Sequence, residues 1–353
     1  MLKNPAPIIG RKIRLAVVGC GRISEKHFEA IARHSADIEL VAVCDSSREA
    51  LEAAVARTGA RGFLDLEDLV GKSDADAVVL CTPSGLHPAQ AIAVARSGRH
   101  VITEKPMATR WHDGLEMVKA CDDAGVHLFV VKQNRKNATL RLVKDAMDRR
   151  RFGRIFMVNI NVFWSRPQEY YDSASWRGTW EFDGGALMNQ ASHYVDLVDW
   201  LVGPVESVQA YVGTLARNIQ VEDTAVVSVR WRSGALGSVN ATMLTYPRNL
   251  EGSLTILGEK GTVRVGGVAV NQIQHWEFAE PEPSDATVEQ ASYATTSVYG
   301  FGHPIYYENV VQTLRGAALP DTDGREGLRS LEILIASYLS ARDGRRVALP
   351  LEY

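Results

Sequence analysis

The chain has 353 residues, 46% of them hydrophobic and 23% charged, with a formal net charge of −3. Such a length predicts two domains, and the small net charge argues against nucleic acid or an anionic membrane as a partner. There is no apolar run of the roughly 20 residues that span a bilayer and no signal-peptide core, so a cytoplasmic protein is expected. The four cysteines form no CxxC pair, which favours free thiols.

From residue 13 to about 133, short β-branched runs alternate with helical patterns, which predicts βαβ units and a parallel sheet. The runs are nearly continuous in apolar residues, as in strands that helices cover on both faces. Residues 1–133 are therefore expected to form a Rossmann dinucleotide-binding domain. The predicted strands lie at 13–19, 38–45, 76–83, 100–106 and 126–133.

The first strand ends in the sequence VVGCGRIS, which places Gly19 and Gly21 before a helical pattern. Two glycines in such a turn let a pyrophosphate approach the helix N-terminus, and small Ser24 can replace the usual third glycine. The second strand ends in Asp45, whose carboxylate would accept hydrogen bonds from a ribose and repel a 2′-phosphate. These features predict a nucleotide site that prefers NAD to NADP. Its other expected cofactor contacts are Arg22, Ile23 and Ser46.

Two further strands end in the motifs TPSGLH (82–87) and EKP (104–106), at the edge where a doubly wound sheet binds its ligand. A Pro/Gly turn with His87 at the start of a helix explains the residues of the first motif nearly as well as contact with a cofactor does. In the second, Lys105 either extends to solvent or acts at the site, because a lysine beside a buried strand is costly to desolvate. The candidate cofactor contacts from these motifs are Thr82, Pro83, His87, Glu104 and Lys105.

Residues 134–353 are expected to form a substrate-binding and oligomerisation domain. After a helical pattern at 138–150, many short strands follow with turn signals between them, which predicts a large, mostly antiparallel sheet. The segment 279–304 is poor in large aliphatic residues and is expected to be a long loop. Two helical patterns close the chain, at 306–316 and 325–344.

The sequence DGGALMNQASHYVDL, residues 183–197, predicts the start of one helix. Helical spacing places Asn189 and His193 one turn apart, away from an apolar stripe. A dehydrogenase needs a base near the hydroxyl proton and a donor for the developing alkoxide, and Lys105 and His193 can share these roles. We favour Lys105 as the residue bonded to the hydroxyl, although the sequence does not decide which of the two takes the proton. Asn189 would position the substrate, and Asp196 either orients the His193 ring or faces solvent.

The segment before this helix is rich in arginine and aromatic residues. Arginine suits planar anions and aromatic rings suit a uracil or sugar face, although solvated loop residues are the alternative. The candidate substrate contacts are Arg166, Tyr170, Trp176 and Arg177, with Gln133, Tyr299 and His303 as weaker candidates.

With GCGRIS, TPSGLH, EKP and GGALMNQASH in this order, the whole chain resembles the glucose-fructose oxidoreductase, inositol dehydrogenase and rhizopine catabolism (Gfo/Idh/MocA) family. The resemblance implies an α/β fold, with an N-terminal Rossmann domain and a C-terminal domain on an open, mostly antiparallel sheet, and a dimer or tetramer. The family's EKP lysine corresponds to Lys105, and its histidine-bearing helix corresponds to Asn189 through His193. Asn189 stands where the family usually has Asp, which removes one candidate base.

Residues 163–197 and the sequence VVKQNRKNATL resemble, more narrowly, UDP-N-acetylglucosaminuronate 3-dehydrogenases of bacterial surface polysaccharide pathways. This implies NAD-dependent oxidation of C3 of UDP-2-acetamido-2-deoxy-D-glucuronate, in the biosynthesis of a diacetamido-uronic acid for lipopolysaccharide or O-antigen. The alternatives are a family dehydrogenase for a polyol or unactivated sugar and a catalytically silent NAD-binding sensor. No metal site is predicted. The sequence leaves open whether NADH is released or recycled in the site with 2-oxoglutarate.

Overall fold

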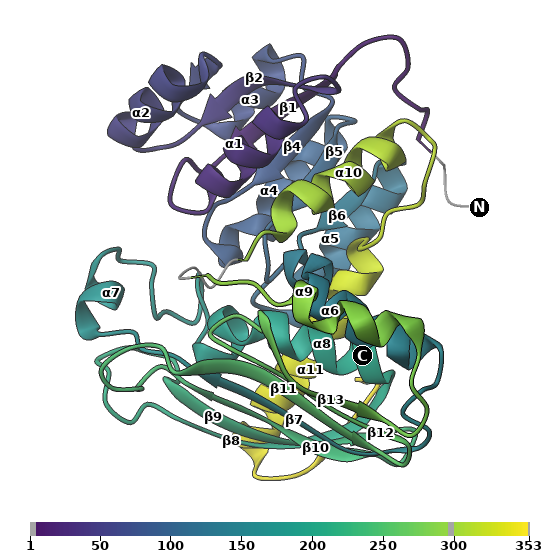
Figure 1. Cartoon of the computed structure of the whole chain (residues 1–353). Coiled ribbons are helices and arrows are strands. Elements are labelled where there is room, and N and C mark those ends of the chain that lie inside the picture. Colours follow the sequence, from purple (N-terminus) through teal and green to yellow (C-terminus); the bar gives the residue numbers. More distant parts are fainter. Residues whose placement is uncertain (1–4, 296–299, 352–353) are drawn as a thin grey trace. The chain divides into compact units, whose positions relative to one another are not determined.

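The computed structural model describes residues 5–295 and 300–351, which form two compact units (Figure 1). Unit 1 comprises Met1–Lys132 and His303–Leu328, and unit 2 comprises Gln133–Gly302 and Arg329–Tyr353. The predicted boundary after residue 133 lies one residue from this division. The return of residues 303–328 to unit 1 was not predicted and departs from the expected second domain of 134–353.

Unit 1 contains a six-stranded parallel sheet in the order β3-β2-β1-β4-β5-β6, which confirms the predicted Rossmann fold. The strand order reverses between β1 and β4, the position at which such sheets bind dinucleotides. The elements are β1 (Ile13–Val18), α1 (Ser24–Arg33), β2 (Ile38–Cys44), α2 (Arg48–Thr58), β3 (Arg61–Phe63), α3 (Leu66–Lys72), β4 (Ala77–Leu80), η1 (Ser84–Leu86), α4 (His87–Arg96), β5 (His100–Thr103), α5 (Trp111–Ala124) and β6 (Leu128–Val130).

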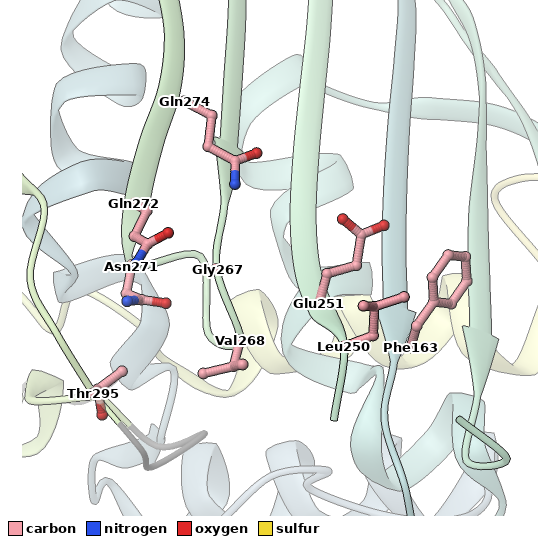
Figure 2. A pocket seen from close by; sticks show the side chains of 9 residues that line it. All are labelled: Phe163, Leu250, Glu251, Gly267, Val268, Asn271, Gln272, Gln274 and Thr295. Carbon is pink, nitrogen blue, oxygen red and sulfur yellow. The ribbon is translucent and has the colours of Figure 1, made fainter. Parts of the chain in front are cut away.

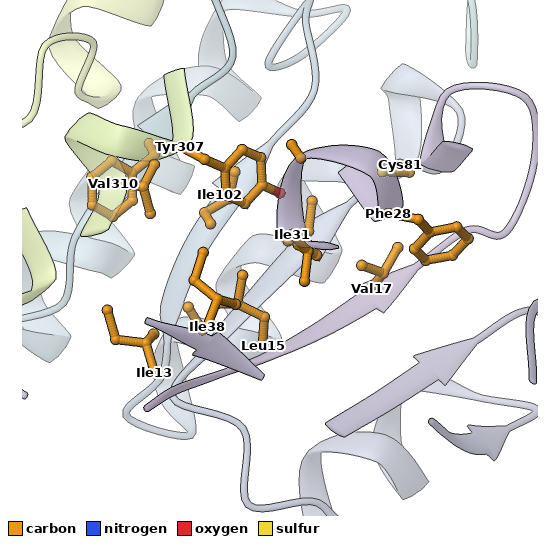
Figure 3. Close-up of a cluster of buried hydrophobic side chains, with 14 of the residues drawn as sticks. Ile13, Leu15, Val17, Phe28, Ile31, Ile38, Cys81, Ile102, Tyr307 and Val310 are labelled. Atoms are coloured by element: carbon orange, nitrogen blue, oxygen red, sulfur yellow. The ribbon is translucent and has the colours of Figure 1, made fainter. Parts of the chain in front are cut away.

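The returning helix α10 (Gly302–Leu314) completes the hydrophobic core of unit 1. Figure 3 shows its Tyr307 and Val310 in the same cluster as Leu15 of β1, Ile31 of α1 and Ile102 of β5. Apolar burial is the dominant stabilising contribution to a fold, so these contacts explain why the segment belongs to unit 1 despite its distance along the chain.

Unit 2 contains an eight-stranded sheet in the order β13-β12-β11-β7-β10-β9-β8-β14. The pair β7 and β10 is parallel and the other pairs are antiparallel, so the predicted mostly antiparallel sheet is confirmed. The elements are η2 (Gln133–Lys136), α6 (Ala138–Asp148), β7 (Ile155–Phe163), α7 (Gln168–Asp172), η3 (Ala186–Gln190), α8 (Ser192–Val202), β8 (Val205–Gly213), β9 (Thr224–Trp231), β10 (Leu236–Thr242), β11 (Glu251–Gly258), β12 (Gly261–Gly266), β13 (Gln272–Phe278), η4 (Pro283–Thr287), α9 (Val288–Ala291), α11 (Gly324–Asp343, which begins in unit 1) and β14 (Val347–Ala348).

The predicted long loop at 279–304 contains the short helices η4 and α9, and α10 already begins at Gly302. The four cysteines are free thiols, and three of them are buried. Among the described residues, no helix is both long enough and apolar enough to cross a membrane.

Candidate active site

The turn after β1 has the geometry that the glycine motif predicts. Gly19 has φ +88°, and a Cβ on it would lie 2.7 Å from the Cys81 carbonyl carbon, so only glycine fits between the ends of β1 and β4. A Cβ on Gly21 would meet nothing within 4 Å, which leaves this side of the turn open to a ligand. Ser24 is fully buried at the start of α1, and its hydroxyl donates to the Gly21 carbonyl at 2.6 Å. The small third residue therefore closes the turn.

Asp45 lies beside this turn at the end of β2. Its Oδ2 accepts from the Cys20 N–H at 2.7 Å and its Oδ1 from the Ser47 N–H at 2.8 Å. Each carboxylate oxygen has a further lone pair with which it can accept from a ribose hydroxyl. Asp45 therefore supports the glycine turn in addition to its expected contact with the cofactor, and the residues at this sheet edge fit a dinucleotide.

His87 ties the TPSGLH and EKP motifs together. Its Nε2 lies 2.9 Å from the Thr82 carbonyl oxygen and its Nδ1 lies 3.0 Å from the Pro106 carbonyl oxygen. The ring is buried, and burial lowers its pKa, although the hydrogen bonds to the two carbonyl oxygens favour the charged form, in which both ring nitrogens donate. His87 thus holds the loops that follow β4 and β5 in place, while Thr82 and Pro83 remain at the carboxyl end of β4.

Glu104, directly before Lys105, is buried in a cluster with two histidines. His27 Nε2 lies 3.0 Å and His303 Nε2 lies 3.4 Å from its Oε1, and its Oε2 accepts from the Lys105 N–H at 3.1 Å. Burial alone would raise the pKa of Glu104, but the hydrogen bonds from both histidines lower it well below its ordinary value. This cluster fixes the backbone at Lys105, whose side chain is half-buried.

The three ligand atoms of this cluster lie within 4.8 Å of one another, a spacing that can also hold a metal ion. Hydrogen bonds account for the arrangement here, because both Nε2 atoms approach the same oxygen and His27 Nδ1 is bonded to the Tyr307 hydroxyl at 2.7 Å. His303 was expected in the substrate pocket. It lies in unit 1 and is buried against Glu104, because α10 packs on the Rossmann core.

The predicted single helix from residue 183 was wrong in its first turns. Residues 186–190 form the π-helical turn η3, closed by a bond from the Ala191 N–H to the Ala186 carbonyl at 2.8 Å, and α8 begins only at Ser192. The spacing between Asn189 and His193 therefore spans two kinds of helix. The predicted apolar stripe is buried, but so are His193 and Asp196.

His193, at the start of α8, is bonded to Gln133 of η2. The two Nε2 atoms lie 3.1 Å apart, and since the amide nitrogen is a donor, the imidazole Nε2 is the acceptor. Asp196 does not face solvent: its two oxygens accept from Nε and one terminal nitrogen of Arg135, both at 2.7 Å. Gln133, which is expected to contact substrate, is therefore in direct contact with the candidate catalytic ring.

The structure brings the predicted arginine and aromatic residues together. Arg166 and Arg177 both lie over the Tyr170 ring, at 5.4 and 4.4 Å from its centre, and Arg177 also lies over Trp176 at 4.5 Å. An Arg177 terminal nitrogen donates to the Tyr170 hydroxyl at 2.6 Å. Neither guanidinium has a carboxylate partner among the residues that the structure describes.

Asp183 connects this arginine cluster to η3. Its Oδ2 accepts from the N–H of Gly178, next to Arg177, at 2.8 Å, and its Oδ1 accepts from the Asn189 amide at 2.5 Å. A buried carboxylate is thus in direct contact with the amide that replaces the family's usual Asp. The last predicted substrate contact, Tyr299, lies outside the described residues.

Unit 2 contains a hollow of about 550 Å³ that none of the predicted site residues lines. Figure 2 shows the residues around this hollow. It is lined by Phe163, Leu250, Glu251, Gly267, Val268, Asn271, Gln272, Gln274 and Thr295. A Cβ on Gly252 would lie 1.9 Å from the Tyr194 hydroxyl of α8, and neighbouring side chains of a strand alternate between faces. The Glu251 side chain, which lines the hollow, therefore points to the side of β11 opposite Tyr194 of α8.

Sequence reasoning missed His27, Glu222 and Tyr338, which support the candidate residues from elsewhere in the chain. Glu222 and Tyr338 contact η3, and His27 contacts Glu104. Asp183, whose role was also missed, lies in the DGG sequence, and its position directly before two glycines was the only signal for it in the sequence. His27, Glu222 and Tyr338 could not be found from residue spacing, because they reach the candidate site only through tertiary packing.

Two comparisons with known protein families cover most of the chain. Residues 13–132 match the family described as "Oxidoreductase family, NAD-binding Rossmann fold", and residues 144–349 match "Oxidoreductase family, C-terminal alpha/beta domain", both of the Gfo/Idh/MocA type. A protein with 26% identity over 360 residues, covering 96% of this chain and 90% of its own length, is D-apiose dehydrogenase of Paraburkholderia graminis.

Two solved structures are much more similar. The WlbA dehydrogenase of Chromobacterium violaceum, in complex with NADH and UDP-GlcNAcA, has 70% identity and a TM-score of 0.95, over 98% of this chain and 99% of that chain. The WlbA dehydrogenase of Bordetella pertussis, with the same two ligands, has 68% identity and a TM-score of 0.96, over 98% and 100%. With these matches and the geometry of both units, the chain belongs to the Gfo/Idh/MocA family of NAD-dependent oxidoreductases.

Proposed function

We propose that the protein oxidises the C3 hydroxyl of UDP-2-acetamido-2-deoxy-D-glucuronate to the 3-keto sugar, with NAD as hydride acceptor. The observation that carries this proposal is the pair Arg166 and Arg177 over Tyr170, two partly buried cations with no acid partner among the described residues. Such cations favour an anionic ligand, and this substrate carries a pyrophosphate and a carboxylate. The two WlbA structures, which contain NADH and UDP-GlcNAcA, support the same ligands for this chain.

Lys105 and His193 are the proposed proton-handling pair, and Asn189 the group that positions the sugar. NAD, when bound, accepts the hydride from C3. Lys105 extends from the end of β5, on the sheet edge that carries the nucleotide motif, so we assign it the hydrogen bond to the C3 hydroxyl. His193 accepts a hydrogen bond at Nε2 from Gln133, which requires the neutral ring with its proton on Nδ1, and we assign it as the partner of Lys105.

The wider setting of the reaction is also part of the proposal. Free cysteines agree with a reducing, cytoplasmic compartment, where the 3-keto product would enter the synthesis of a diacetamido-uronic acid for lipopolysaccharide. We further propose a homo-oligomer formed through the sheet face away from α8. This face carries the exposed Met157, Val226 and Leu236 beside the polar contact between Asn161 and Asn240.

The proposed function is tested with purified protein, NAD and a panel of possible substrates, by the absorbance of reduced nicotinamide. UDP-GlcNAcA should give turnover, whereas UDP-GlcNAc, which lacks the carboxylate, and myo-inositol, which lacks both anionic groups, should give little. Equal or faster turnover with myo-inositol would favour a polyol dehydrogenase. Binding of NAD without turnover of any compound in the panel would favour the catalytically silent NAD-binding sensor.

A further inference from the structure

A buried carboxyl group lies against the π-helical turn that carries Asn189. Glu222, in the segment before β9, is 2% exposed. Its backbone carbonyl accepts from the Ala186 N–H at 2.9 Å, and its Oε1 accepts from the Leu187 N–H at 2.8 Å. The first N–H groups of a helix have no partner within the helix, so one residue satisfies two of them from outside.

Tyr338 of α11 extends this arrangement to the next residue. Its hydroxyl accepts from the Met188 N–H at 3.2 Å and donates to Glu222 Oε1 at 2.9 Å. Three consecutive N–H groups of η3 are therefore held by Glu222 and Tyr338. These side chains come from different parts of the sequence, and their shared hydrogen bond fixes them relative to each other.

The glycines of the DGG sequence fit this arrangement. A Cβ on Gly185 would lie 1.9 Å from Glu222 Oε2, so any larger residue would displace the carboxyl group. Gly184 has φ +76°, a conformation that residues with a side chain rarely adopt. The carboxyl group of Glu222 thus occupies the space that Gly185 leaves open, directly before η3.

We propose that Glu222 is a positioning residue, which with Tyr338 holds η3 in its wide π-helical form and thereby sets the positions of Asn189 and of His193 at the start of α8. A π-helical turn is rare, and single turns of this kind are frequently found at functional sites. Without these contacts, the turn would tighten towards an α-helix and Asn189 would rotate relative to His193. This inference rests on the proposed roles of those two residues.

The protonation state of Glu222 decides which substitution preserves the arrangement. Burial, with the charge of Asp223 beside it, raises the pKa of Glu222 to about 7. The groups that face it are Asp223 in its own segment, the Tyr338 hydroxyl of α11 and the N–H groups of η3. Its Oε1 accepts hydrogen bonds in either state, while Oε2 has no hydrogen-bond partner among the described residues. Glutamine can therefore keep the essential acceptor.

The test compares Glu222→Leu, Glu222→Gln and Tyr338→Phe with the wild type, using turnover of UDP-GlcNAcA and amide hydrogen exchange of the segment 183–193. Glu222→Leu should lower kcat by at least about tenfold with the KM for NAD unchanged, since a small misplacement of reacting groups has effects of this size. Glu222→Gln should restore kcat to within about threefold of the wild type. Tyr338→Phe, which removes only a hydroxyl, tests the same contacts if Glu222→Leu does not fold. Exchange in the segment should rise in Glu222→Leu and Tyr338→Phe.

The matched control is Glu332→Ala on α11, which also removes a carboxylate that accepts a backbone N–H, that of Leu351, and should change neither readout. Unchanged exchange in Glu222→Leu and Tyr338→Phe would overturn the inference, whether or not the wild type uses UDP-GlcNAcA. Faster exchange with wild-type kcat would also overturn it, because the contacts would then stabilise the turn without positioning the site. Inactivity of the wild type on UDP-GlcNAcA would overturn the proposed function separately.

Discussion

Gln133 and His193 are joined through their Nε2 atoms, 3.1 Å apart, inside unit 2. Replacing Gln133 by Leu removes the donor, and we expect kcat to fall by about tenfold while the KM for NAD stays constant. Gln133→Glu replaces a donor by an acceptor, which favours a proton on Nε2, so the acid limb of the pH profile should move to higher pH. A wild-type kcat in Gln133→Leu together with a wild-type pH profile in Gln133→Glu would contradict this role of Gln133.

Lys105 and His193 are expected to carry the proton transfer. Lys105→Met and His193→Asn should each lower kcat by at least about 100-fold, because general acid and base groups contribute on this scale. Both variants should still bind NAD, as measured by titration, since neither change touches the glycine turn or Asp45. Near-normal turnover of His193→Asn across the pH range would leave Lys105 as the only candidate base.

Arg166 and Arg177 are expected to bind the anionic parts of the substrate. Changing either to Met should raise the KM for UDP-GlcNAcA by roughly tenfold or more and leave the KM for NAD nearly unchanged, because a charge-assisted contact to one ligand is lost. The matched control is Arg154→Met, which removes another arginine of unit 2 that lies over an aromatic ring, that of Phe156. Equal small effects on both ligands would mean that the two arginines are solvated surface residues.

The preference for NAD over NADP is expected to depend on Asp45. Asp45→Asn removes the charge that would repel a 2′-phosphate and keeps one acceptor oxygen for the glycine turn, so the ratio of the two Kd values should narrow. Asp45→Ala should weaken binding of both cofactors as well, because the Cys20 and Ser47 N–H groups lose their acceptor. Tighter binding of NADP than of NAD by the wild type would show that this interpretation of Asp45 is wrong.

The raised pKa of Glu222 predicts how the stability of the folded protein changes with pH. Burial raises the pKa of this group from 4.5 to about 7 in the folded protein, so the folded state binds the proton more tightly than the unfolded state. The protonated carboxyl group therefore contributes to the free energy of unfolding. This contribution is fully present below the pKa of the unfolded state and is lost as the pH rises through about 7, and it amounts to about 3 kcal/mol. Between pH 5 and pH 8 the wild-type Tm should fall relative to that of Glu222→Gln, which does not titrate. If the Tm values of the wild type and of Glu222→Gln changed in parallel with pH, the raised pKa of Glu222 would be contradicted.

The sequence was sufficient for those features that depend on local pattern. The alternation of apolar runs and helices predicted the parallel sheet of unit 1. The same local pattern identified the glycine turn and Asp45, which the structure joins by a hydrogen bond. It was not sufficient where distant segments meet. Nothing in the spacing of residues 183–197 indicates a π-helical turn, because that turn depends on Glu222 and Tyr338. Likewise, the burial of His303 against Glu104 could not be predicted from the sequence, because it depends on how α10 packs.

Transfer of hydride from C3 of the sugar to NAD can be followed with substrate that carries deuterium at C3. With UDP-GlcNAcA labelled only at that carbon, we expect the deuterium to appear in the reduced nicotinamide, in a one-to-one ratio to the 3-keto sugar, as measured by mass spectrometry. Reduced nicotinamide without deuterium, or a product that retains the label at C3, would show that the hydride does not come from C3.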